Sequence, residues 1–146
     1  MSDLIQQMKV VLASTFAMYL KAQNFHWNVE GPNFTEYHKL FGDIYGDLWG
    51  SVDEIAERIR TLDHYAPGSM SRFSQLSVID DQINIPTAKS MVSELLSDNA
   101  KMLSELNRAF DMADKAGKQG IADFFAGRID THEKHGWFLR SGAKAQ

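Results

Sequence analysis

The chain of 146 residues is long enough to bury a substantial core, and its length predicts one domain over residues 1–146. It has no cysteine, which excludes disulfides and thiolate metal sites and leaves His, Asp and Glu as candidate ligands. A net charge of −4 without blocks of like charge argues against binding nucleic acid through a basic surface. The sequence shows neither a signal peptide nor an apolar run near the roughly 20 residues of a membrane span, so we expect a soluble, cytoplasmic protein.

Four long stretches carry apolar residues at a period near 3.6, which is typical of amphipathic helices. The connection between the second and third stretches, residues 63–86, is long and contains one short helix near 71–76. Thr35 is the expected N-cap of the second helix. The predicted long helices cover about residues 2–29, 35–62, 87–116 and 121–140, followed by a polar tail. This pattern predicts an all-α, up-down-down-up four-helix bundle of the ferritin type.

The second predicted helix carries three polar residues on one side. At about 100° per residue, Asp53 lies about 60° and Glu57 about 100° around the helix from His38. The rise of about 1.5 Å per residue separates His38 from Glu57 by roughly 28 Å, so one helix cannot bring them to one metal ion. A second copy running antiparallel, with its two-fold axis near residues 47 and 48, would place residue 38 opposite residue 57. An imidazole would then face two carboxylates, a donor set that suits iron, zinc or manganese.

Ordinary structural roles compete with this interpretation. A histidine on a helix is more often a hydrogen-bonded structural residue than a ligand. Asp53 and Glu57 could belong to a solvated face and pair with neighbouring arginines. Trp27, Tyr45 and Trp49 could pack at the junction between the two copies, although core filling is the default role of each.

Glycines and the remaining histidines also bear on the site. Gly42, Gly46 and Gly50 each cost about 1 kcal/mol of helix propensity relative to Ala, and their spacing would let another helix approach closely. His132 and His135, on the last helix, are expected to face solvent or cap the helix.

Three segments together resemble the Dps family of miniferritins, the DNA-binding proteins from starved cells. The residues that carry the resemblance are NFHWNVEGPNFTEYHKLF (24–41), SVDEIAERIR (51–60) and the last helix, IADFFAGRIDTHEKHGWFLRS (121–141). The resemblance implies a hollow dodecamer of four-helix bundles. It also implies a ferroxidase that oxidises Fe(II), preferably with hydrogen peroxide rather than oxygen, stores ferric mineral and serves in oxidative stress.

The resemblance implies roles for particular residues. His26 and His38 of one subunit would face Asp53 and Glu57 of the partner subunit at a two-fold interface, with Trp27 beside this ferroxidase centre. A further acidic position would line a three-fold pore and attract Fe(II). The candidates for that pore position are Asp123 and Asp130.

Two features depart from the family pattern. The family usually has Asp four residues after the second His, where this chain has Gly42. Asp43 is turned about 100° further around the helix than residue 42, and Asp47 about 180° from His38, so neither replaces the lost ligand. We therefore expect His26, Asp53 and Glu57 to form the stronger iron position and His38 a weaker one, with reduced activity. The chain also lacks a Lys-rich terminal tail, which argues against DNA binding.

Two other functions stay open beside the ferroxidase. One is a Dps-like shell that binds zinc or little metal, which Gly42 favours. The other is a DNA-protecting protein, which the net charge disfavours.

Overall fold

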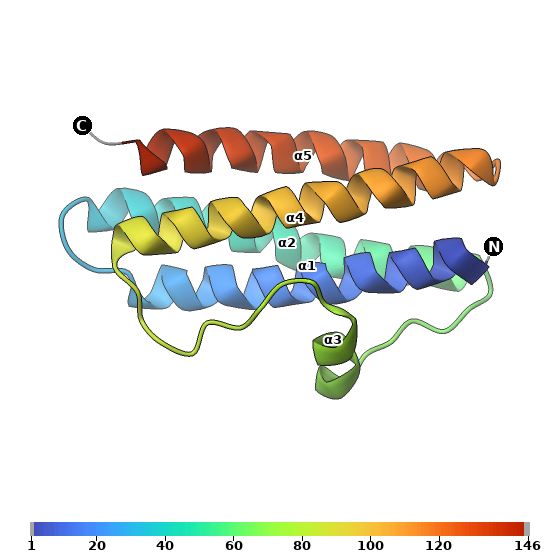
Figure 1. Ribbon diagram of the computed structural model, residues 1–146, viewed down its shortest axis with the longest axis horizontal. Coiled ribbons are helices and arrows are strands. Elements are labelled where there is room, and N and C mark those ends of the chain that lie inside the picture. The colour runs from blue at the N-terminus through green and yellow to red at the C-terminus, as the bar shows by residue number, and fades with distance from the viewer. Residues whose placement is uncertain (1, 145–146) are drawn as a thin grey trace.

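Helices account for all the regular structure in residues 2–144, the range that the structure describes, and no strand occurs within it (Figure 1). Residues 1, 145 and 146, at the two ends of the predicted domain, lie outside this range. In this computed structural model the helices are α1 (Ser2–Asn28), α2 (Phe34–Thr61), α3 (Met70–Leu76), α4 (Ala88–Lys115) and α5 (Gln119–Ala143). The all-α prediction is confirmed.

The four long helices form the predicted up-down-down-up bundle (Figure 1). A short loop makes α1 and α2 antiparallel neighbours, and another makes α4 and α5 a second hairpin. The connection from α2 to α4 returns along the length of the bundle and carries α3, which packs against α1. The α1–α4 contact joins the two hairpins, whereas α2 and α5 touch much less.

Local chemistry explains where the helices begin and end. The second helix starts at Phe34 rather than after Thr35, because Asn33 adopts a left-handed conformation (φ 64°) that Asn tolerates and its carbonyl accepts from Tyr37 N–H. Thr87 caps α4 as a side-chain acceptor for Ser90 N–H. Gly117 (φ 72°) ends α4 in the conformation that favours glycine.

The polar tail predicted after residue 140 is helical as far as Ala143. Gly142 lies within reach of Leu40 and Val92, so tertiary packing extends the last helix beyond its apolar periodicity.

Apolar side chains from all four long helices fill the bundle. The largest fully buried ones are Met8, Leu12, Met18, Phe25, Phe41, Ile44, Leu48, Ile55, Ile59, Met91, Leu95 and Phe125. Each such side chain contributes about 1.5–3 kcal/mol on burial, so this core supplies the main stabilising contribution. No helix among residues 2–144 has the length and hydropathy needed to cross a bilayer.

One charged pair lies inside the bundle between α1 and α4. Lys21 Nζ lies 2.9 Å from Asp98 Oδ2 and 3.9 Å from Glu94 Oε1. The Lys21–Asp98 contact is an ion pair without hydrogen-bond alignment, since Asp98 Oδ2 has no hydrogen-bond partner. Burial raises the pKa of Asp98 in spite of this pair. Gln82, from the long connection, donates to both Glu94 oxygens and so ties that connection to the bundle.

Candidate metal centre

His26 and His38 form a reciprocal pair at the α1–α2 end of the bundle. His26 Nδ1 lies 2.6 Å from the His38 carbonyl oxygen, and His38 Nδ1 lies 2.7 Å from the His26 carbonyl oxygen. A carbonyl oxygen can only accept, so each Nδ1 carries the proton and donates. Each Nε2 is then left with its lone pair for a metal ion, the arrangement that outer hydrogen bonds impose on metal-binding histidines.

The two imidazole rings are stacked, with centroids 3.7 Å apart and planes 17° from parallel. Imidazole binds a metal at about 2.0–2.1 Å, in the plane of its ring. Because the planes are nearly parallel, one ion cannot lie in both planes close to both Nε2 atoms. The pair can therefore serve two ions side by side, but it cannot chelate one.

Gly42 lies directly beneath the His26 ring. A Cβ atom at residue 42 would lie 3.0 Å from both Cε1 and Nδ1 of His26, closer than the 3.4–4 Å of ordinary contact. The absence of a side chain thus lets the imidazole rest against α2. Gly42, in place of the Asp usual in the family, therefore removes a carboxylate and also makes room for the His26 ring.

Asp53 and Glu57 lie on the same uninterrupted helix as His38 but nearer its other end, and both are exposed. At about 1.5 Å per residue, roughly 28 Å of helix separates His38 from Glu57. One chain therefore brings the two histidines together but does not bring the carboxylates to them. No group of three or more His, Asp or Glu able to hold a metal occurs within residues 2–144 of the single chain.

The arginines beside these carboxylates are engaged elsewhere. Arg58 lies over the Phe124 ring, 3.9 Å from its centroid, and donates to the Glu54 carbonyl. Arg60 donates to the His64 carbonyl. The salt bridges found among the described residues do not include Asp53 or Glu57, which weakens the interpretation of DEIAER as an ordinary ion-paired face.

Neither neighbouring aspartate fills the place of the missing carboxylate. Asp43 pairs with Lys39 at 2.8 Å on the exposed side of α2. Asp47 faces α5, where Arg128 donates to both of its oxygens at 2.9 and 2.8 Å and His135 Nε2 donates at 2.8 Å. Burial alone would raise the pKa of Asp47, but the hydrogen bonds and charges of Arg128 and His135 outweigh it and hold that pKa well below its usual range.

The expectation that His132 and His135 face solvent is wrong. His132 is only 1% exposed, and its Nδ1–H donates to Asn99 Oδ1 at 2.8 Å while Asn99 Nδ2 donates to the His132 carbonyl. Arg128 donates toward His132 Nε2 at 3.3 Å. Burial, with the nearby positive charge of Arg128, lowers the pKa of His132 to about 3. Both histidines belong to a polar network that links α2, α4 and α5.

The buried His132 predicts that the free energy of unfolding depends on pH. Because the folded-state pKa of His132 lies at about 3, below its ordinary value, unfolded chains bind a proton that the folded protein does not. The free energy of unfolding should fall as pH drops below about 6.5, by up to about 1.4 kcal/mol per pH unit. Denaturant unfolding between pH 7 and pH 4 should show this slope, and His132→Gln should remove it. The exposed His64, changed to Gln, is the control; an unchanged slope in His132→Gln would contradict the assignment.

The predicted core roles of Trp27 and Trp49 are wrong for the single chain. Trp27 is 62% and Trp49 57% exposed, whereas Tyr45 is half-buried against Tyr19 and His26. On α2, residues 38, 42, 45, 49 and 53 follow one another along one side of the helix. The histidines, the exposed indole and the first carboxylate therefore lie along one face.

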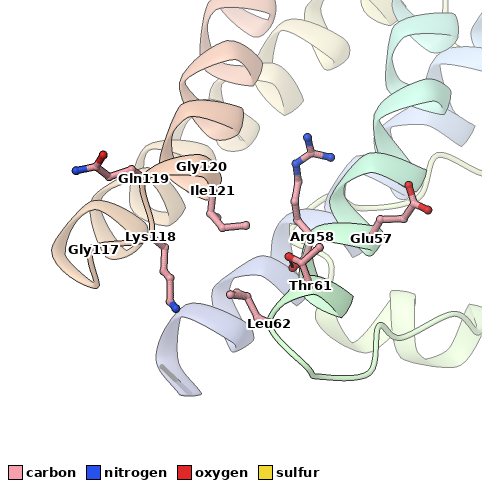
Figure 2. A pocket seen from close by; sticks show the side chains of 9 residues that line it. All are labelled: Glu57, Arg58, Thr61, Leu62, Gly117, Lys118, Gln119, Gly120 and Ile121. Carbon is pink, nitrogen blue, oxygen red and sulfur yellow. Dashed lines mark hydrogen bonds between the residues drawn. The ribbon is translucent and has the colours of Figure 1, made fainter.

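An open surface pocket of about 780 Å³, lined in part by Glu57, lies between the end of α2 and the α4–α5 turn (Figure 2). Arg58, Thr61, Lys118 and Ile121 line it, and the Glu57 side chain points away from the turn (Figure 2).

The two pore candidates, Asp123 and Asp130, are exposed on α5.

The residues that sequence reasoning missed are those whose partners lie far along the chain. Asp47 and Arg128 are separated by 81 residues, and Asn99 and His132 by 33. One local feature of the sequence indicated the position of Asp47. It lies about half a turn around α2 from His38, on the side that faces the bundle.

Comparison with known proteins identifies the family. Residues 5–144 match the Ferritin family, a ferritin-like domain. The chain is 36% identical over 137 residues to an uncharacterized low temperature-induced protein of Nostoc, covering 92% of this chain and 76% of the relative. It is 32% identical over 146 residues to the DNA protection during starvation protein of Brevibacillus brevis, covering 97% and 98%.

Solved structures agree with these relatives. The structure of Dps from Staphylococcus aureus superimposes with a TM-score of 0.96 at 29% identity, covering 100% of this chain and 98% of that one. A Dps protein from Vibrio cholerae, described as a member of a broad superfamily of ferritin-like diiron-carboxylate proteins, gives 0.93 at 27% identity, covering 98% and 90%. The up-down-down-up bundle, the histidine pair and these matches agree, and the chain belongs to the Dps family of ferritin-like proteins.

Proposed function

We propose that this protein is an iron-storage miniferritin that oxidises Fe(II) with hydrogen peroxide at centres shared between two copies of the chain. The observation that carries the proposal is the reciprocal histidine pair, in which both Nδ1 atoms are occupied by carbonyls and both Nε2 atoms remain for metal. The description of the Vibrio cholerae relative as diiron-carboxylate supports iron as the metal.

A second copy would complete the centre. With α2 antiparallel to its copy, Asp53 and Glu57 of the partner subunit would face His26 and His38, and both carboxylates are exposed for this contact. The ring stacking favours two iron positions next to each other over one position between the rings. A closed shell of such pairs, the dodecamer of the family, would enclose the ferric product, with Asp123 and then Asp130 as the acidic residues of an entry pore.

The residues divide the chemistry between them. His26 Nε2 with the two carboxylates forms the stronger Fe(II) position, and His38 with water forms the weaker one. The carboxylates offset the charge of Fe(II) and favour the Fe(III) that oxidation leaves behind. The carbonyl bonds to Nδ1 keep both imidazoles in the tautomer that binds metal.

Anaerobic Fe(II) titration followed by peroxide tests the proposal. We expect the wild-type protein to bind a single Fe(II) tightly per centre and to oxidise it on addition of peroxide. His26→Ala should weaken tight binding by at least roughly 10- to 100-fold, since even outer contacts of metal ligands have effects of that size. His38→Ala should spare the tight position and slow oxidation, and His64→Ala, at an exposed position just beyond the far end of α2, should change neither.

Three outcomes would contradict this proposal in whole or in part. Two tightly bound irons per centre in the wild type would contradict the weakened second position. Tight Zn²⁺ binding without peroxide-dependent oxidation would favour a shell of low activity, which Gly42 would explain. A shift of duplex DNA in low-salt gels would favour DNA protection, which the net charge disfavours.

A further inference from the structure

Phe34, the first residue of α2, stacks on the imidazole ring of His38. The two ring centroids lie 5.2 Å apart, with planes 28° from parallel. His26 already covers one face of the His38 ring, at 3.7 Å and 17°. A second stacked ring at 5.2 Å has no room beside His26 on that face, so Phe34 covers the opposite one. Both faces of the His38 imidazole are therefore in contact with another ring.

The start of α2 puts Phe34 in this place. Side chains four residues apart are neighbours on a helix, so the helix must include Phe34 for its ring to meet His38. It does so because Asn33, rather than Thr35, takes the N-cap position, with a left-handed φ of 64°. The Phe34 N–H also donates to the Gly31 carbonyl at 3.1 Å. The turn between α1 and α2 thus fixes Phe34 one helical turn before the histidine that its ring covers.

Core packing does not explain the position of this ring. Among the described residues, Phe34 belongs neither to the buried apolar core nor to the partly buried residues that pack against it. Within residues 2–144 its aromatic contact is with His38 alone. This contact lies within one chain, so it does not depend on whether a second copy covers the outer side of Phe34.

The surroundings of His38 leave one ring atom for a metal ion. His38 Nδ1 donates to the His26 carbonyl at 2.7 Å, so Nε2 keeps its lone pair. An imidazole with one open face can turn to another side-chain rotamer, which breaks the Nδ1 bond and redirects Nε2. Phe34 occupies the open side, and its ring therefore holds the His38 imidazole against His26.

His26 is held by other groups. Its ring rests on Gly42, where a Cβ would lie 3.0 Å away, and Tyr45 lies tilted against it at 5.1 Å. His26 Nδ1 donates to the His38 carbonyl, a backbone atom that stays in place when the His38 ring turns. Loss of the Phe34 ring should therefore disturb His38 and leave His26 in position.

We propose that Phe34 is the positioning residue of the weaker iron position, because it keeps His38 Nε2 directed at the second metal ion. The inference rests on the proposed ferroxidase function and concerns how the second Fe(II) is held. Phe34 binds no metal and acts only through His38. Its role is large in this chain because Gly42 leaves the weaker position without a carboxylate, so the affinity depends more on how the imidazole is oriented.

Titration of the assembled protein with Co(II) tests this role. Phe34→Leu, which keeps an apolar side chain but removes the ring, should weaken binding of the second Co(II) by roughly 2- to 10-fold, the effect of one aromatic contact. Binding of the first Co(II) should not change, and Phe34→Tyr, which keeps the ring, should bind both ions like the wild type. Phe138→Leu is the matched control, because Phe138 is equally exposed (43%) but packs edge-on against Trp137.

A double-mutant cycle shows whether Phe34 acts through His38. Phe34→Leu should slow peroxide-dependent Fe(II) oxidation in the wild-type protein and should cause no further loss in His38→Ala. An equal loss in both backgrounds, or no loss in the wild-type background, would overturn the inference. If no variant and no wild-type sample oxidised Fe(II) with peroxide, the ferroxidase function would be contradicted instead, and the Co(II) titration would still test the role of Phe34.

A metal-free crystal structure of Phe34→Leu provides a measurement that needs neither iron nor turnover. We expect the His38 ring to adopt more than one orientation and to lose its 2.7 Å bond to the His26 carbonyl, while His26 stays on Gly42. Phe34→Met, a second variant without the ring, takes its place if Phe34→Leu does not assemble. A His38 ring as well ordered without the Phe34 ring as with it would overturn the inference.

Discussion

Gly42→Asp is expected to raise iron binding from one to two ions per centre and to speed peroxide-dependent oxidation. The added carboxylate would lie one helical turn after His38, on the side of α2 that carries the centre. It would supply a ligand and a negative charge to the weaker position, for an expected gain of roughly 10- to 100-fold in affinity for the second ion. Anaerobic Fe(II) titration and stopped-flow oxidation measure both effects.

The structure adds an opposing effect to this prediction. Any Cβ at residue 42 would meet the His26 ring at 3.0 Å, so the ring must shift slightly and its Nδ1–H bond to the His38 carbonyl must adjust. Gly42→Ala measures this steric cost alone, and Gly42→Asn adds a neutral side chain of the same shape as Asp. Faster Fe(II) oxidation in Gly42→Asp, but not in Gly42→Asn or Gly42→Ala, would show that the wild-type centre lacks a carboxylate ligand. Loss of tight binding in all three variants would instead identify Gly42 as the residue that makes room for His26.

Asp47→Asn is expected to destabilise the folded protein by roughly 3–5 kcal/mol, because it leaves the buried Arg128 guanidinium without its counter-charge. Asp47 joins α2 to α5, two helices that otherwise touch little, through two bonds from Arg128 and one from His135. Chemical denaturation at pH 7 measures the loss. Asp43→Asn is the matched control, because that residue pairs with Lys39 on the exposed side of the same helix, where such pairs contribute little.

The pH dependence of the unfolding free energy tests the role of Asp47 in a second way. The folded-state pKa of Asp47 is depressed, so its contribution to stability is complete above the unfolded-state pKa of about 3.9 and is lost as pH falls toward the folded-state pKa. The difference in unfolding free energy between wild type and Asp47→Asn should be constant from pH 7 to about pH 5 and should shrink below about pH 4. A difference that grows on acidification would contradict the assigned ion pair.

The position of the candidate centre follows from how the bundle is built. The α1–α2 loop is short, so the last turn of α1 lies against the first turn of α2, and His26 and His38 can exchange bonds with each other's backbone. A straight α2 then carries Asp53 and Glu57 away from that end. The metal chemistry proposed here thus needs a second chain, because the helix that supplies both kinds of ligand cannot bend back on itself.

The sequence by itself determined the helices, the bundle order and the face of α2 that carries His38, Asp53 and Glu57. These properties depend on local periodicity, and neighbours in the chain decide them. Helix ends were less exact: Asn33 took the N-cap position expected for Thr35, and packing carried α5 through to Ala143. The assignment of Asp53 and Glu57 as iron ligands stays a prediction.

Only the tertiary structure decided how side chains from different helices meet. In the folded protein, His26 stacks on His38 over Gly42, and Asp47 accepts hydrogen bonds from Arg128. His132 is buried against Asn99, and the rings of Tyr45, Tyr19 and Trp49 lie next to one another. These contacts join residues between 12 and 81 positions apart, and most depend on how one helix is rotated against another. Periodicity shows which face of a helix is apolar, but the close packing of the whole core sets that rotation, so no single stretch of sequence contains it.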